Sequence, residues 1–69
     1  MYKRQEAIRY AKRLLQANPR DARAWDGLME AYDATGELDR AILAAERLKL
    51  LRPKDASLDR RITALRNRL

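Results

Sequence analysis

Apolar residues recur every three to four positions through most of this sequence, which is the period of an amphipathic helix. The first such segment covers residues 2–17 and contains neither Gly nor Pro. Asn18-Pro19 ends it, because a residue that precedes proline is displaced from helical backbone angles. The segment predicts a helix whose apolar face carries Ala7, Ile8, Ala11, Leu14 and Leu15.

Three further helices are predicted by the same period. Asp21 is a favourable N-cap for the second, and Gly36 should end it in the left-handed conformation. The third runs from about Leu38 to Leu51 before Pro53, and Asp55 caps the fourth. The loops are short, so sequential helices should pack as antiparallel neighbours. Their apolar positions are Ala24, Trp25, Leu28, Met29, Ala31 and Tyr32, then Ala41, Ile42, Ala45 and Leu48, then Leu58, Ile62, Leu65 and Leu69.

The sequence also repeats itself with a shift of 34 positions. When residues 5–21 are aligned with residues 39–55, seven of the seventeen positions are identical. Self-similarity at a fixed period of this length is typical of arrays of stacked helix pairs. The identical pairs are Ala7/Ala41, Ile8/Ile42, Ala11/Ala45, Arg13/Arg47, Leu14/Leu48, Pro19/Pro53 and Asp21/Asp55.

A period of 34 residues with this content resembles the tetratricopeptide repeat. The residues that match the family pattern are Trp25, Leu28, Tyr32, Gly36, Ala41 and Pro53. Met29 departs from it, because the family has a small residue there. Ala45 replaces a bulky aromatic and Leu48 replaces a small residue, which together look like an exchange of volume within one packing layer.

The resemblance implies an all-α fold, an α-solenoid of four antiparallel helices in one domain of residues 1–69. Residues 22–55 would form one full repeat. Residues 1–18 would supply the second helix of a preceding repeat, and residues 56–69 would form a C-terminal capping helix. We expect this division of the chain from the alignment of the repeat.

The capping role follows from two polar replacements in the last segment. Asp59 and Arg66 stand 34 positions after Trp25 and Tyr32. Polar residues at such positions would give the end of a repeat stack a wettable face, which terminal repeats need.

Two other families share part of the pattern. Pentatricopeptide repeats, which bind single-stranded RNA, have similar Leu, Tyr, Gly and Ala positions, but their usual glycine before the closing proline is Arg52 here. The segment of residues 28–42 is also similar to helical repeat modules attached to bacterial transcription activators. In those proteins a separate domain binds DNA.

Composition excludes several kinds of chemistry. The 69 residues include no Cys and no His, so disulfides, thiolate or imidazole metal sites and histidine-activated nucleophiles are absent. We therefore expect no enzyme activity and no cofactor. No apolar run approaches the roughly 20 residues of a membrane span, and the start lacks a secretory pattern. The cytoplasm is the expected location.

In the tetratricopeptide family the first helices of successive repeats line a concave groove that binds peptides. The resemblance implies a protein or peptide partner on that face, but no carboxylate clamp, because Asp26 and Gly27 replace its Lys and Asn. Pairing of acidic and basic helices is the alternative explanation of these charges. The positions on that face are Arg23, Asp26, Glu30 and Asp33, then Ser57, Arg60, Ala64, Asn67 and Arg68.

The conspicuous aromatic residues are better explained by packing than by ligand binding. Trp25 and Tyr32 occupy core positions of the repeat pattern, and we expect Trp25→Ala to cost about 3–5 kcal/mol. The net charge of +6, with Arg supplying twelve of sixteen basic residues, also suits nucleic acid. Only Tyr2 and Tyr10 are left for base stacking, so a solvated basic surface is favoured.

Self-association is a further hypothesis. Leu43 and Leu50 lie seven positions apart on the third predicted helix, away from its apolar face. Together with the uncovered face of the first helix, they could form an apolar patch of the kind that marks association, although single surface leucines are common.

Overall fold

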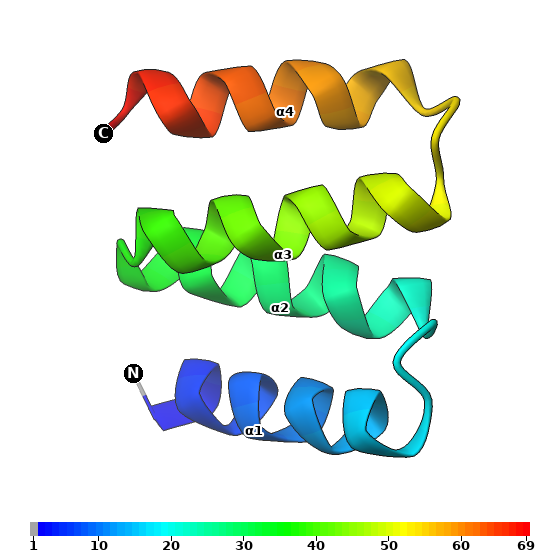
Figure 1. Cartoon of the computed structure of the whole chain (residues 1–69). Helices are drawn as coiled ribbons and strands as arrows, with labels where there is room; N and C mark the ends of the chain where they lie inside the picture. The colour runs from blue at the N-terminus through cyan, green and yellow to red at the C-terminus, as the bar shows by residue number, and fades with distance from the viewer. Residues whose placement is uncertain (1) are drawn as a thin grey trace.

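The computed structural model describes the backbone of residues 2–69 and the side chains of residues 5–69. It contains four helices, α1 (Tyr2–Ala17), α2 (Ala22–Thr35), α3 (Leu38–Leu51) and α4 (Ala56–Asn67), and no strand in this part of the chain. Successive helices run antiparallel and are stacked in chain order (Figure 1). Extensive contacts join α1 to α2, α2 to α3 and α3 to α4. The predicted all-α helical-repeat fold is confirmed.

The ends of the helices follow from local hydrogen bonds. The Asp21 carboxylate accepts a hydrogen bond from the Ala24 N–H at 3.2 Å, and the Asp55 carboxylate accepts one from the Ser57 N–H at 3.0 Å. Gly36 has a φ of 81° and its N–H donates to the Asp33 carbonyl. These contacts satisfy polar backbone groups that a helix end leaves unpaired.

A single core runs along the stack between the helices. Small residues of α3 allow close approach to α2, and the larger Leu48 and Leu65 are almost completely enclosed. The buried residues are Ile8, Ala11, Ala24, Leu28, Met29, Ala31, Tyr32, Ala41, Ile42, Ala44, Ala45, Leu48, Leu58, Ile62 and Leu65.

Five positions of the predicted apolar faces are less buried than the period suggests, and two of them, Leu14 and Leu15 of α1, are partly buried. Ala7 is exposed, because α1 packs extensively against α2 alone. Leu69 is exposed because α4 ends at Asn67 and the last residue lies beyond it. Trp25 is only partly buried, and its indole N–H donates to the Pro19 carbonyl at 2.8 Å.

Candidate functional site

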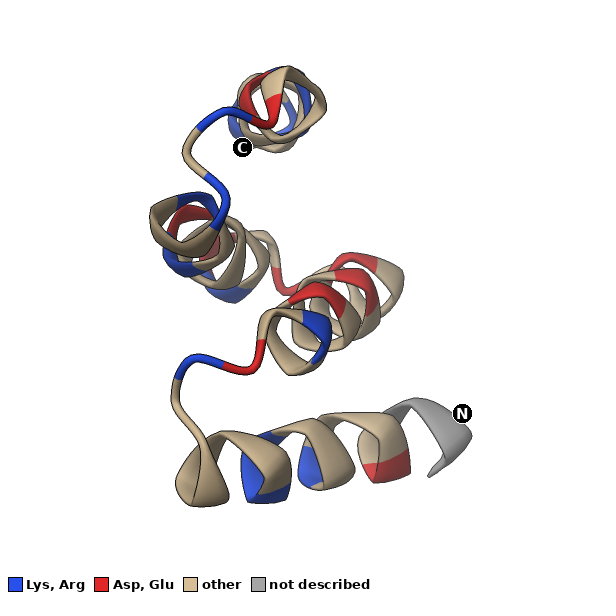
Figure 2. Ribbon diagram, turned by 90° about the vertical axis from the view of Figure 1, so that its right-hand side faces the viewer, with Lys and Arg blue, Asp and Glu red and all other residues tan. Residues whose placement is uncertain are grey.

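The most highly organised charged surface lies where α2 faces α4. Asp26, Glu30 and Asp33 follow each other at intervals of four and three, so they share one side of α2. Figure 2 shows acidic positions gathered on α2, whereas α4 carries both basic and acidic positions. The expected acidic face of α2 and basic face of α4 therefore lie opposite each other in the folded chain.

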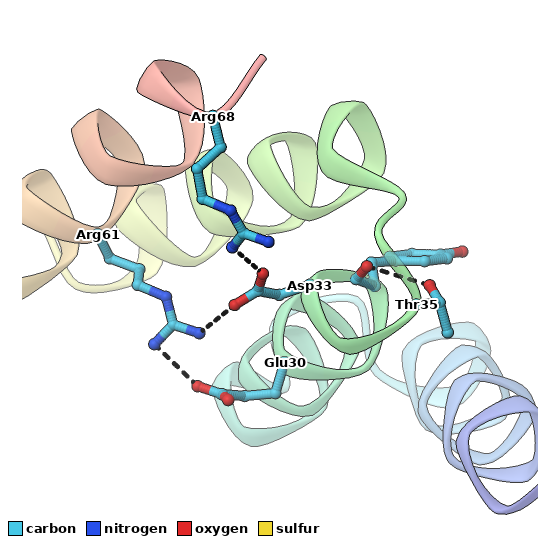
Figure 3. A network of polar contacts seen from close by, with 6 residues as sticks. Glu30, Asp33, Thr35, Arg61 and Arg68 are labelled. Atoms are coloured by element: carbon cyan, nitrogen blue, oxygen red, sulfur yellow. Dashed lines mark hydrogen bonds and ion pairs between the residues drawn. The ribbon is translucent and has the colours of Figure 1, made fainter. Parts of the chain in front are cut away.

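Arg61 of α4 and Arg68, the residue directly after α4, reach across to this acidic row (Figure 3). The Arg61 guanidinium contacts Glu30 Oε1 at 3.0 Å and Asp33 Oδ2 at 3.1 Å. Arg68 pairs with the other oxygen of Asp33. Asp33 thus receives one arginine on each carboxylate oxygen, and its side chain is partly buried. The network ties the C-terminal helix to α2, although the two helices are not neighbours in sequence.

The network changes the acid–base properties of its members. The hydrogen bond from Arg68, supported by the charges of Arg68 and Arg61, holds the pKa of Asp33 below its ordinary value, although burial opposes this. The hydrogen bond with Glu30 raises the pKa of Arg61, again against the effect of burial. Asp33 and Arg61 are therefore held in their charged forms, Asp33 chiefly by Arg68 and Arg61 chiefly by Glu30.

A small cleft runs beside the network. Its volume of about 240 Å³ is below the usual range for small-molecule sites, so it suits a single side chain of a partner better than a substrate. Asp26 is partly buried and takes part in none of the ion pairs among the described residues. The cleft is lined by Asp26, Met29, Glu30, Leu48, Arg52, Asp55, Ser57, Leu58 and Arg61.

The structure brings together only part of the residue set taken from the sequence. Glu30, Asp33 and Arg68 meet in the network, and Asp26 lies beside it. Arg60 and Asn67 instead line a separate shallow depression on α4, and Arg23 is exposed near the start of α2. These last three residues do not join the network.

Arg61 is the residue that sequence reasoning missed. The tetratricopeptide pattern assigns its neighbour Arg60, and not Arg61, to the concave groove. The signal that could have found it is the spacing of Arg61 and Arg68, which are seven positions apart and therefore share one helix face. Two carboxylates spaced three positions apart on α2 complement such a pair.

Comparison with known proteins agrees with this architecture. A family model described as tetratricopeptide repeat matches residues 2–69. The chain belongs to the tetratricopeptide repeat family. Searches of curated proteins and of solved structures found no significant match.

Tetratricopeptide repeats generally mediate protein–protein interaction. Among the described residues, no helix is long and apolar enough to cross a membrane. The same part of the chain contains no group of three or more Asp, Glu, His or Cys residues placed to hold a metal ion.

A larger groove of this tetratricopeptide chain lies between α3 and α4, with a volume of about 550 Å³. Two ion pairs cross it. Asp59 pairs with Lys49, and Arg66 contacts Glu46 Oε2 at 2.7 Å. Asp59 and Arg66 are the residues 34 positions after Trp25 and Tyr32, so charged pairs stand where the preceding unit has aromatic side chains.

The residues considered for self-association are exposed. Leu43 and Leu50 on α3 are 54% and 73% exposed, and Leu50 lies at the α3–α4 groove. Tyr10 on α1 is also exposed and lines a shallow depression with four polar or basic neighbours. Those neighbours are Arg9, Lys12, Arg13 and Gln16.

Proposed function

We propose that the chain is a non-catalytic protein-interaction module of the tetratricopeptide type. In this proposal residues 22–55 form the full repeat, residues 1–18 supply the second helix of a preceding repeat, and residues 56–69 cap the stack. The family's general role in protein–protein interaction supports the class of function.

The α2–α4 face is the proposed binding surface. The observation that carries this proposal is that the acidic residues of α2 differ in how many ion pairs they form. Asp33 is already held by two arginines and Glu30 by one. Asp26 takes part in no ion pair among the described residues and borders the cleft. A partner peptide that offers Lys or Arg would find a charge-assisted hydrogen bond at Asp26 without breaking the internal pairs.

The other candidate residues lie farther from the centre of this surface. Arg23 lies one helical turn before Asp26 and can contact the acidic part of a bound segment. Arg60 and Asn67 line a different depression, so a peptide centred on Asp26 would meet them only if it crossed α4. We therefore expect Asp26 to dominate and Arg60 and Asn67 to contribute little.

Selection from a random peptide library displayed on phage tests this proposal. Enriched peptides should carry Lys or Arg, and their Kd should rise about tenfold with Asp26→Asn, since a charge-assisted hydrogen bond contributes roughly 1.5–3 kcal/mol. Asp39→Asn is the matched control, because Asp39 is an exposed carboxylate of α3 outside the cleft. A selection without enrichment, or peptides that ignore Asp26→Asn, would contradict the proposal.

A nucleic-acid-binding helical repeat is the second candidate, and the exposed Tyr10 among basic residues of α1 is the observation that favours it. An exposed aromatic ring beside Arg and Lys is the combination that stacks a base and holds its phosphate. Fluorescence anisotropy with labelled oligouridine at about 50 and about 150 mM NaCl tests it. Binding that weakens with salt and with Tyr10→Ala would support this candidate. No binding at tens of micromolar would remove it.

A further inference from the structure

Among the described residues, no helix covers the face of α1 that corresponds by the repeat to a buried face of α3. On α3, three positions of one face are almost completely buried, at 0%, 1% and 1% exposure for Ala41, Ala44 and Leu48. The residues 34 positions earlier on α1 are more open: Ala7 is exposed, Leu14 is partly exposed, and Tyr10 is 64% exposed.

The contacts of the helices explain this difference. α3 packs extensively against both α2 and α4, whereas α1 does so only against α2. A shift of 34 positions aligns α1 with α3 and α2 with α4, so the α1–α2 contact corresponds to the α3–α4 contact. Among the described residues, no helix lies beside α1 in the position that α2 takes beside α3. Its uncovered face, made of Ala7, Tyr10 and Leu14, has the position of a surface that a helix covers elsewhere in this chain.

The opposite end of the stack is a poor cover for this face. In a head-to-tail arrangement the α3–α4 groove of one copy would receive α1 of the next. The groove presents Asp59, Thr63 and Arg66, and two of these are engaged in ion pairs with α3. An apolar face placed there would remove charged groups from water without new partners, which is costly.

The α1 helix of a second copy would cover this face better, because the charged residues beside the face can form ion pairs with those of an identical helix. Glu6 and Arg13 are exposed, lie seven positions apart, and flank the face formed by Ala7, Tyr10 and Leu14. Neither takes part in an ion pair among the described residues. When two such helices pack antiparallel about a two-fold axis near Tyr10, Glu6 of each copy faces Arg13 of the other.

We propose that two copies of this chain associate through a two-fold axis, with α1 packed antiparallel against α1 of the second copy. The interface buries Ala7, Tyr10 and Leu14, and two Glu6–Arg13 pairs set its register. A closed two-fold dimer is the commonest symmetry of protein oligomers. The proposal rests on the interaction role proposed above and names its partner as a second copy, on a surface different from the Asp26 cleft.

Charge reversal on α1 tests the pairing directly. Dimer dissociation constants are measured by sedimentation velocity between about 5 and about 500 µM, a range suited to a small interface. Glu6→Lys and Arg13→Glu should each weaken the dimer about fivefold or more, because like charges then face each other. The double variant keeps the net charge and should restore the constant to within about twofold, because the pair is re-formed with its signs exchanged.

Two further variants separate this dimer from other modes of association. Leu43→Lys/Leu50→Lys should leave the dimer unchanged, since these leucines lie on α3 outside the proposed interface. Thr63→Arg, in the α3–α4 groove, should also have no effect. All substituted side chains are exposed, so circular dichroism should show the parent's helix content in each variant.

Several outcomes would overturn the proposal. These are a monomer throughout the concentration range, a double reversal that fails to restore association, loss of the dimer in the leucine variant, or loss in Thr63→Arg. The last result would instead indicate head-to-tail stacking. Peptide binding at Asp26 is measured separately, so a failed dimer leaves that result standing, and a failed peptide selection leaves the dimer measurable.

Discussion

At the scale of single residues, Arg61 and Asp33 show what a sequence pattern leaves open. The sequence indicates that α2 is acidic and α4 basic along facing surfaces. It does not indicate which of the adjacent Arg60 and Arg61 reaches α2, because a rotation of α4 by one residue exchanges them. In the structure Arg61 contacts both Glu30 and Asp33, while Arg60 lies in another depression.

The lowered pKa of Asp33 predicts an acid-dependent loss of stability. The folded state binds fewer protons to Asp33 than the unfolded state does. Its contribution is therefore complete above the ordinary aspartate pKa of about 4 and is lost as the pH falls through the lower folded value. Urea unfolding at about pH 5 and about pH 2.5 should show a smaller decrease in unfolding free energy for Asp33→Asn than for the parent. Equal decreases would contradict this assignment.

Substitutions of Trp25 should lower the unfolding free energy, and the partial burial of this side chain limits the size of the loss. Trp25→Phe removes the indole N–H that donates to the Pro19 carbonyl, so the unfolding free energy should fall by about 1 kcal/mol. Trp25→Ala should cost about 3 kcal/mol, the lower end of the range for a buried tryptophan. Leu43→Ala is the control, since Leu43 is exposed and lies outside the proposed dimer interface, so stability should change by less than about 0.5 kcal/mol. Thermal melts of the three variants measure the difference; a Trp25→Phe protein as stable as the parent would show that the hydrogen bond adds nothing.

At the scale of helices, the sequence was a good guide because caps and stops act over a few residues. Asp21, Asp55 and Gly36 were predicted to begin and end helices, and each does so through local hydrogen bonds or backbone angles. The extent of burial was harder to foresee. Ala7 follows the apolar period but remains exposed, because period alone does not show which faces find a neighbour.

The two glycines predict opposite effects of the same substitution. Gly36→Ala should destabilise by about 1 kcal/mol or more, because an alanine side chain disfavours the observed φ of 81°. Gly27→Ala should stabilise by up to about 1 kcal/mol, because Gly27 lies inside α2 and an added Cβ would meet no atom within 4 Å. Chemical denaturation of both variants measures the sign. Effects of the same sign at both positions would contradict this account of the α2 backbone.

At the scale of the whole molecule, the two ends of the stack differ. The uncovered face of α1 carries Ala7, Tyr10 and Leu14, whereas the groove between α3 and α4 is crossed by ion pairs. Repeat stacks extend when each end offers an apolar surface to the next unit, so charged residues at one end limit growth in that direction. We interpret Asp59 and Arg66 as the residues that stop the stack.

If Asp59 and Arg66 stop the stack, replacing both residues should allow further copies of the chain to stack at this end. Asp59→Trp/Arg66→Tyr restores the aromatic residues of the preceding unit and removes both ion pairs from the groove. Sedimentation velocity should then show open-ended oligomers that grow with concentration, because a head-to-tail contact does not close on itself. Arg60→Trp/Asn67→Tyr is the matched control, with the same aromatics at the same spacing outside the groove. Growth in the control, or none in the test variant, would contradict the capping role.

The sequence by itself determined the four helices, their ends and the 34-residue period, because these depend on short-range preferences and on spacing that can be read along the chain. It also identified the acidic α2 row and the polar replacements at Asp59 and Arg66. Only the tertiary structure decided that Arg61 bridges two carboxylates, that Trp25 is partly exposed and that Ala7 and Tyr10 of α1 are exposed. These features depend on how each helix is rotated against the others, and a helical period leaves that rotation open.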